Sequence, residues 1–243
     1  MSSEFLLLFI FALFAVGAVA VHIISRKKER LQKINAWKKF FVYFFVIYSI
    51  FLFILYASVL FIAICFLVAL GGVFEIVRLQ LKSQPQLAWS RFYLYFSIYI
   101  ALAVLFLFFA FESVKIQILT VFIVGIFDAF SQLSGQLFGK RKITPSISPN
   151  KTLGGLIGGT CSALILGIIV NFYLEFEIMT AVLLILCVVA ASFVGDLLAS
   201  YLKRQYAVKD YSALIPGHGG ILDRFDSLIA AGAVMYLLKF GIY

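Results

Sequence analysis

Four aspartates lie inside or beside long apolar segments in the C-terminal half of the chain: Asp128, Asp196, Asp223 and Asp226. Ionisable side chains are costly in such segments and by default mark a functional site. Converging carboxylates repel one another unless a cation or protons neutralise them, and oxygen ligands favour hard cations such as Mg²⁺. The pattern predicts a hard-cation site, with structural salt bridges to Arg224 and nearby lysines as the alternative.

A polar loop joins the second of these aspartates to the last two. Three cations in it could hold phosphates: Lys203, Arg204 and Lys209. A proline and three glycines predict a tight entry into the final apolar segment: Pro216, Gly217, Gly219 and Gly220. His218, between these glycines, could donate a hydrogen bond to a phosphate or polar head group, although an isolated histidine is more often structural.

A second polar loop, residues 139–159, combines basic side chains, hydroxyls and glycines. Its cations and hydroxyls are Lys140, Arg141, Lys142, Lys151, Ser148 and Thr152. Hydroxyls and amides at a helix N-terminus suit phosphate, but the GxxxxGK[ST] spacing of a P-loop is absent. The glycines that follow, with Gly155 and Gly159 in a GxxxG pattern, have an alternative interpretation as small residues in membrane-helix packing.

The elements that must position these residues are membrane spans. Hydrophobic types make up 64% of the 243 residues and charged types 13%, against about 45–50% and about 25% in soluble domains. A bilayer core needs about 20 apolar helical residues. The sequence therefore predicts an all-α, polytopic membrane protein with about eight spans: 5–25, 40–57, 58–77, 92–111, 116–135, 153–173, 179–201 and 220–241. A tight turn near Ala57 divides the second span from the third, and Glu75 lies near the end of the third.

Basic residues predict the orientation of these spans. Of the 20 lysines and arginines, 17 fall in alternate loops: 26–39, 78–91, 136–152 and 202–219. Because such residues stay on the cytoplasmic side, we expect both termini outside and all four aspartates in one layer near the cytosolic surface. Glu4 before the first span and basic residues after it favour an uncleaved helix over a signal peptide.

The net charge of +9 is interpreted as topology and attraction to anionic head groups or nucleotide phosphates, not nucleic-acid binding. The three cysteines form no CxxC pair, so we expect neither a disulfide framework nor a thiolate metal site. No internal repeat is evident. We expect one continuous bundle, with N-terminal spans in 1–115 and catalytic spans in 116–243.

The loop after the seventh span resembles the signature of the phosphatidate cytidylyltransferases, the CDP-diacylglycerol synthases. The positions in register are Ser200, Lys203, Arg204, Lys209, Asp210, Ser212, Pro216, His218, Gly219, Gly220, Asp223, Arg224 and Asp226. The family is also matched upstream by Asp128, Ser148-Pro149, Lys151-Thr152, Gly155, Gly158-Gly159 and Gly195-Asp196-Leu197. The resemblance covers roughly 125–230, but Gly154 and Ala199 stand where family members commonly have glutamate.

The resemblance implies that CTP and phosphatidic acid give CDP-diacylglycerol and pyrophosphate, with Mg²⁺, a possible second cation and a homodimer. It implies that Asp196 and Asp223 hold the metal with Asp226 in support. Phosphates would be neutralised by Lys203, Arg204, Lys209 and Arg224, with His218 in the same catalytic set. Substrate binding would involve Asp128, on metal or a nucleotide hydroxyl, and Ser148, Lys151, Thr152, Ser200, Asp210, Gly219 and Gly220.

Other functions remain open at this stage. A CTP-dependent polyprenol or lipid kinase would attack the γ-phosphorus instead, and a synthase of another CDP-activated lipid would use a different backbone. The glutamates absent at Gly154 and Ala199 are the motive for considering an inactive lipid- or nucleotide-binding relative. A transporter is disfavoured because its charges should lie near mid-membrane. Short loops predict a bacterial inner membrane, with the active site facing the cytosol.

Overall fold

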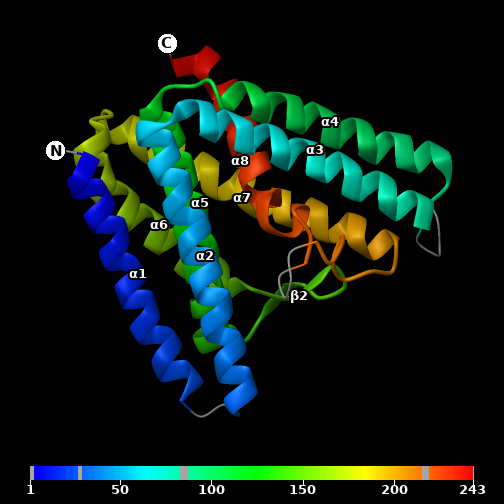
Figure 1. Cartoon of the computed structure of the whole chain (residues 1–243), viewed down its shortest axis with the longest axis horizontal. Coiled ribbons are helices and arrows are strands. Elements are labelled where there is room, and N and C mark those ends of the chain that lie inside the picture. The colour runs from blue at the N-terminus through cyan, green and yellow to red at the C-terminus, as the bar shows by residue number, and fades with distance from the viewer. Residues whose placement is uncertain (1–2, 27–28, 83–86, 215–218, 243) are drawn as a thin grey trace. The chain divides into compact units, whose positions relative to one another are not determined.

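The structure is a computed structural model and describes residues 3–26, 29–82, 87–214 and 219–242. In chain order the elements are α1 (Ser3–Ser25), α2 (Arg30–Tyr56), α3 (Ser58–Lys82), α4 (Trp89–Phe109), α5 (Val114–Phe138), β1 (Lys142–Thr144), β2 (Ser148–Thr152), α6 (Leu153–Leu174), α7 (Ile178–Gln205) and α8 (Leu222–Ile242), as Figure 1 shows. The predicted all-α architecture is confirmed.

Helix length agrees with the predicted membrane spans. Among the described residues, α1 to α7 are long and apolar enough to cross a membrane. The first turns of α8 contain Asp223, Arg224 and Asp226, and this helix is not among those seven. The count of eight spans and the outside position of the N-terminus therefore stay predictions.

Compact packing divides the chain into two units, Met1–Phe61 and Ile62–Tyr243. The first unit contains α1 and α2, which pack through aromatic edges: the Phe14 ring lies 5.0 Å from that of Phe44 and 6.1 Å from that of Phe40. The second unit contains both polar loops. The sequence analysis separated N-terminal spans in 1–115 from catalytic spans in 116–243. That division stays a prediction.

The predicted turn between the second and third spans is present at Ala57, whose φ of −147° and ψ of 61° leave the helical region. Its N–H donates to the Phe53 carbonyl and ends α2, and its own carbonyl accepts from Leu60 N–H as α3 begins. Residues 30–39, within the first basic segment, are the opening turns of α2.

Glycines set the contact between α5 and α6. A Cβ at Gly155 would lie 2.6 Å from the Ser131 carbonyl oxygen, and one at Gly158 or Gly159 would collide with Ser134 or Ser131. Small residues allow two helix backbones to approach this closely. The packing interpretation of these glycines is therefore confirmed.

The contact between α7 and α8 also depends on a small residue. A Cβ at Gly195 would lie 3.0 Å from the Asp226 carbonyl oxygen and would collide with Ala230. This close approach brings the start of α8 beside the part of α7 that contains Asp196. On another face of α8, Gly232 packs against the rings of Phe106 and Phe109 of α4.

Part of the 139–159 loop is a small antiparallel hairpin, which the sequence did not predict. Lys142 of β1 pairs with Thr152 of β2, and Thr144 pairs with Ser148. Leu153 N–H donates to the Arg141 carbonyl at 2.8 Å, so the hairpin leads directly into α6. The hairpin also contacts α7.

Candidate active site

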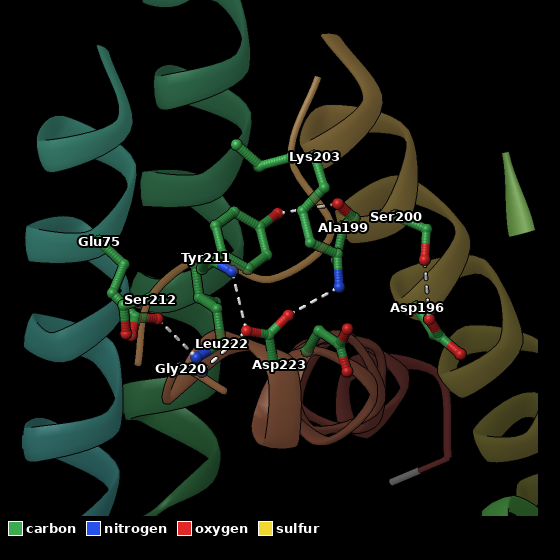
Figure 2. Close-up of polar contacts among 12 residues, drawn as sticks. Glu75, Asp196, Ala199, Ser200, Lys203, Tyr211, Ser212, Gly220, Leu222 and Asp223 are labelled. Carbon is green, nitrogen blue, oxygen red and sulfur yellow. Dashed lines mark hydrogen bonds and ion pairs between the residues drawn. The ribbon is translucent and has the colours of Figure 1, made fainter. Parts of the chain in front are cut away.

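Asp223, in the first turn of α8, is held by three donors (Figure 2). Its Oδ1 pairs with Lys203 Nζ at 2.7 Å. Its Oδ2 accepts the N–H groups of Tyr211 and Gly220, both at 2.8 Å. The side chain is only 4% exposed, so these three donors replace the water that the carboxylate loses.

Lys203, near the end of α7, is enclosed from two sides. Its ammonium pairs with Asp223 and lies 5.3 Å from the centre of the Tyr211 ring. A buried ammonium needs such partners, because an unpaired charge in the interior is strongly destabilising. The position of this cation is therefore set by a carboxylate and an aromatic face together.

Tyr211 ties the loop to α7 and was not predicted as a site residue. Its hydroxyl donates to the Ala199 carbonyl at 2.9 Å. Burial, followed by the nearby charges of Asp226, Asp223 and Glu75, raises the pKa of Tyr211 well above its ordinary value. The phenol therefore stays neutral and remains a hydrogen-bond donor.

A second ion pair joins the hairpin to α7. Lys151 Nζ lies 2.8 Å from Asp196 Oδ2, and Ser200 Oγ donates to the other oxygen at 3.2 Å. The ammonium also lies 4.5 Å from the Phe193 ring centre. The Asp196 side chain is 36% exposed, so this pair is far more open than the pair at Asp223.

Asp226 and Asp128 complete the acidic layer. The charged neighbours of Asp226 are Asp196, Lys203 and Lys151, and those of Asp128 are Asp226, Asp196 and Lys151. Asp226 Oδ1 accepts from the adjacent Ser227 N–H at 2.7 Å. Three aspartates from α5, α7 and α8 thus share one neighbourhood with two lysines, which agrees with the single layer expected from their depths.

The carboxylates of the site only partly match the expected metal. Within the described ranges, no three His, Cys, Asp or Glu side chains form a group that could hold a metal ion. Asp196 and Asp223 each have an ammonium as their close counter-ion. These all-oxygen ligands suit a hard cation bound by one or two carboxylates and completed by substrate phosphates, but they do not form a preassembled cage.

The other cations predicted for the site, Arg204, Lys209 and Arg224, are exposed at its edge. Arg204 donates from Nε to the Ile147 carbonyl at 3.1 Å and from Nη1 to the Val208 carbonyl at 3.0 Å, so it ties the hairpin to the signature loop. Asp210 is exposed as well. The structure therefore separates enclosed cations from cations open to solvent.

Two predicted phosphate-binding hydroxyls lie on β2. Thr152 is the N-cap of α6, and its Oγ1 accepts the Gly155 N–H at 3.1 Å. Ser148, at the other end of the strand, is half-buried. The hydroxyl of Thr152 thus already serves the helix terminus, as hydroxyl N-caps commonly do.

Gly219 and Gly220, just before α8, are required for different structural reasons. Gly219 has a φ of +88°, a conformation that other residues rarely adopt. A Cβ at Gly220 would collide with the Glu75 carboxylate. His218, predicted in the catalytic set, and Pro216 lie outside the described residues.

Glu75 of α3 received no role from the sequence, yet it is fully buried at the start of α8. It accepts the Ser212 hydroxyl at 2.5 Å, the Ile221 N–H at 2.9 Å and the Leu222 N–H at 2.8 Å. The available signal was an ionisable residue inside an apolar segment. Its partners are too distant in sequence for spacing to predict them.

The two positions that lack a family glutamate have distinct surroundings. A Cβ at Gly154 would lie 3.0 Å from the Phe138 carbonyl oxygen and 3.4 Å from Gly139 Cα. A side chain there would need the end of α5 to move by a few tenths of an ångström. Ala199 instead contributes its carbonyl to Tyr211.

Fold and site together define a helical integral membrane protein with a layer of aspartates and lysines at the start of its last helix. The sequence model of the Cytidylyltransferase family matches residues 2–240, and the chain belongs to this family. The resemblance found in the sequence is thereby confirmed.

Several curated relatives are named phosphatidate cytidylyltransferase. The relative from Staphylococcus saprophyticus is 37% identical over 133 residues, which cover 54% of this chain and 51% of the relative. The relative from Haemophilus influenzae is 46% identical over 124 residues, which cover 47% of this chain and 42% of the relative. The relative from Rickettsia conorii is 38% identical over 120 residues, which cover 46% of this chain and 52% of the relative. The chain thus spans about half the length of the curated relatives it matches.

Proposed function

We propose that the protein is a phosphatidate cytidylyltransferase, which joins CTP to phosphatidic acid and releases pyrophosphate. The observation that carries the proposal is the presence of two lysine–aspartate pairs, Lys203–Asp223 and Lys151–Asp196, both near Asp226. Its second support is the family itself, whose relatives bear that name.

In the proposed reaction, a phosphate oxygen of phosphatidic acid attacks the α-phosphorus of CTP. A new oxygen–phosphorus bond forms, and the bond from the α-phosphorus to the bridging oxygen of pyrophosphate breaks. The attacking phosphate is close to a dianion at neutral pH, since its second pKa is about 6. No protein nucleophile is required. The barrier is the approach of two anions, so catalysis requires positioning and charge neutralisation.

Lys151 and Lys203 would provide that neutralisation. Each ammonium is paired with a carboxylate, which holds it near the place where phosphates would bind. Arg204, Lys209 and Arg224 would attract the triphosphate from the rim. Ser148, Thr152 and Ser200 would contribute hydroxyls, and Gly219 and Gly220 would allow a close backbone approach.

Mg²⁺ would be held by Asp196 and Asp223, with Asp226 in support. When bound, it would neutralise CTP phosphates and stabilise pyrophosphate as the leaving group. Asp128 would bind either a second cation or a nucleotide hydroxyl. His218 and Asp210 would support the same phosphates from the loop.

The proposed setting is a bacterial inner membrane, with the site facing the cytosol and the N-terminus outside. The distribution of basic residues supports this orientation. Phosphatidic acid would enter sideways between helices with its tails in the bilayer. A homodimer and the absence of a nucleic-acid partner belong to the same proposal.

The test uses purified protein in detergent with phosphatidic acid, Mg²⁺ and CTP labelled at either the α- or the γ-phosphorus. We expect α-label in lipid, γ-label in pyrophosphate, and loss of both in Asp223→Asn. Since Asp223 is buried, Asp196→Asn serves as a second, more exposed variant. Transfer of γ-label to an added polyprenol would indicate the kinase. No turnover with any lipid acceptor would favour a binding role.

A further inference from the structure

Glu75 lies outside both motifs, but its carboxylate closes the N-terminus of the helix that contains Asp223. The contacts come from one loop hydroxyl and two successive backbone amides: Ser212 Oγ, Ile221 N and Leu222 N. The first N–H groups of a helix have no partner within the helix, and a carboxylate there is favoured by the helix dipole. Here the cap comes from α3, across 146 and 147 residues of sequence.

Glu75 and Asp223 divide the backbone donors at this entry between them. Glu75 accepts from Ile221 and Leu222, and Asp223 accepts from Tyr211 and Gly220. Asp223 follows Leu222 directly, so any shift of the Leu222 amide moves the backbone from which the Asp223 side chain projects. Glu75 therefore fixes the backbone, and Asp223 uses that position to hold Lys203. Figure 2 shows Glu75 on one side of this loop and Asp223 on the other.

The surface of α3 around Glu75 is shaped for this contact. A Cβ at Gly72 would collide with the Tyr99 hydroxyl and would also lie 3.0 Å from the Leu222 side chain, and one at Gly71 would lie 3.3 Å or closer to atoms of Ile221. A Cβ at Gly220 would collide with the Glu75 carboxylate. Three glycines thus allow α3 and the start of α8 to meet with Glu75 between them. The contact with Glu75 explains two residues of the family pattern: Ser212 donates a hydrogen bond to it, and Gly220 leaves room for it.

We propose that Glu75 is a positioning residue of the active site, which orients Asp223 and Lys203 by capping α8. It touches no reacting atom and acts through the backbone at 221–222. Its kinetic readout rests on the proposed cytidylyl transfer, but its structural readout does not.

The experiment compares Glu75→Gln, Ser212→Ala and the control Glu112→Gln in the full chain in detergent. The glutamine keeps the side-chain size, but its amide group presents a donor where the carboxylate accepted, so one buried N–H loses its partner. Glu112 is a matched control because its side chain is 7% exposed and ion-paired with Lys239 at 2.8 Å. Hydrogen exchange of the 219–226 segment and steady-state kinetics are measured for each.

We expect Glu75→Gln to accelerate exchange by about 10- to 100-fold at whichever of the Ile221 and Leu222 amides loses its acceptor. It should lower kcat by about 10- to 100-fold through misplacement of the charged groups, with KM for CTP changed less than kcat. Ser212→Ala should move both readouts in the same direction by less. Glu112→Gln should move neither.

Unchanged hydrogen exchange at residues 221–222 in Glu75→Gln would show that Glu75 does not cap α8. Faster exchange with wild-type kcat would overturn the positioning role. An equal fall of kcat in Glu112→Gln would do the same, because loss of any buried carboxylate would then suffice. A wild-type protein without cytidylyl transfer would overturn the proposed function instead, and the exchange data would still decide whether Glu75 caps α8.

Discussion

The two lysine–aspartate pairs of the site share one chemistry but differ in their surroundings. The Lys203 and Asp223 side chains are 11% and 4% exposed, and Asp223 also accepts two backbone N–H groups. The Lys151 and Asp196 side chains are 17% and 36% exposed, and Asp196 accepts one further hydroxyl. The first pair is therefore held more firmly by the protein, whereas the second can exchange partners with a ligand at lower cost.

The largest effect is expected from breaking the buried pair. Lys203→Met leaves the Asp223 carboxylate without its cation, and removal of one partner of a buried ion pair costs about 3–5 kcal/mol. We expect a large fall in the thermal unfolding midpoint in detergent, together with loss of activity.

The double variant Lys203→Met with Asp223→Leu separates the two losses. Replacing both partners removes the unpaired charge, so stability should largely return while activity stays absent. Recovery of activity in the double variant would contradict a role for this pair in the reaction.

The more exposed pair, Lys151–Asp196, should affect activity more than stability when it is broken. Asp196→Asn should change the free energy of unfolding by at most about 1 kcal/mol, as expected for a partly exposed pair. It should nevertheless lower kcat by about 10²–10³-fold, because it removes one of the two carboxylates proposed to hold Mg²⁺ against the reacting phosphates. Unfolding and initial rates are measured on the same preparations, and a loss of stability matching that of Lys203→Met would erase the distinction.

A smaller effect is expected where the hairpin that contains Lys151 enters α6. Thr152→Ala removes the cap on Gly155 N–H and should cost about 1 kcal/mol. Because the adjacent Lys151 belongs to the open pair, KM for CTP or phosphatidic acid should rise modestly. Thr152→Ser, which keeps the hydroxyl, is the control and should retain wild-type kinetics.

The smallest effect concerns the aromatic support of the buried pair. Tyr211→Phe removes the hydrogen bond to the Ala199 carbonyl and should cost about 1 kcal/mol. The fold raises the pKa of Tyr211, so its stabilising contribution is present below the ordinary tyrosine pKa of about 10 and is lost as pH rises toward the folded value.

The wild-type protein should accordingly lose more stability than Tyr211→Phe as the pH rises above about 10. Thermal unfolding across alkaline pH measures this difference. The exposed Tyr93 provides the control Tyr93→Phe. Parallel pH curves for wild type and Tyr211→Phe would show that this phenol is not held neutral by the fold.

Much of the helical framework could be predicted from the sequence, because apolar length determines which segments can span a bilayer. The turn at Ala57 and the glycine contact of α6 followed from length and small-residue spacing. The β1–β2 hairpin did not, since its three- and five-residue strands are too short for a periodic signal. Local pattern thus predicted the long elements better than the short ones.

At the site, charge type and spacing predicted that the four aspartates would share one layer, with nearby lysines as possible salt-bridge partners. They did not predict which lysine pairs with which aspartate, because the pairings depend on how the hairpin and the signature loop fold onto α7. Glu75 was noted only as an ionisable residue near the end of a span and Tyr211 was not noted, because most of their hydrogen-bond partners are backbone groups, which have no sequence signature. The sequence thus indicated which charged side chains form the site, but not which backbone groups hold them in place.

Cytidylyl transfer at this site is tested by following lipid-linked label from α-labelled CTP, with phosphatidic acid and Mg²⁺, for the wild type, Asp196→Asn and Glu112→Gln. We expect labelled CDP-diacylglycerol from the wild type and Glu112→Gln, with Asp196→Asn folded but nearly inactive. An Asp196→Asn variant as active as the wild type, or a wild type that labels no lipid, would contradict cytidylyl transfer at this site.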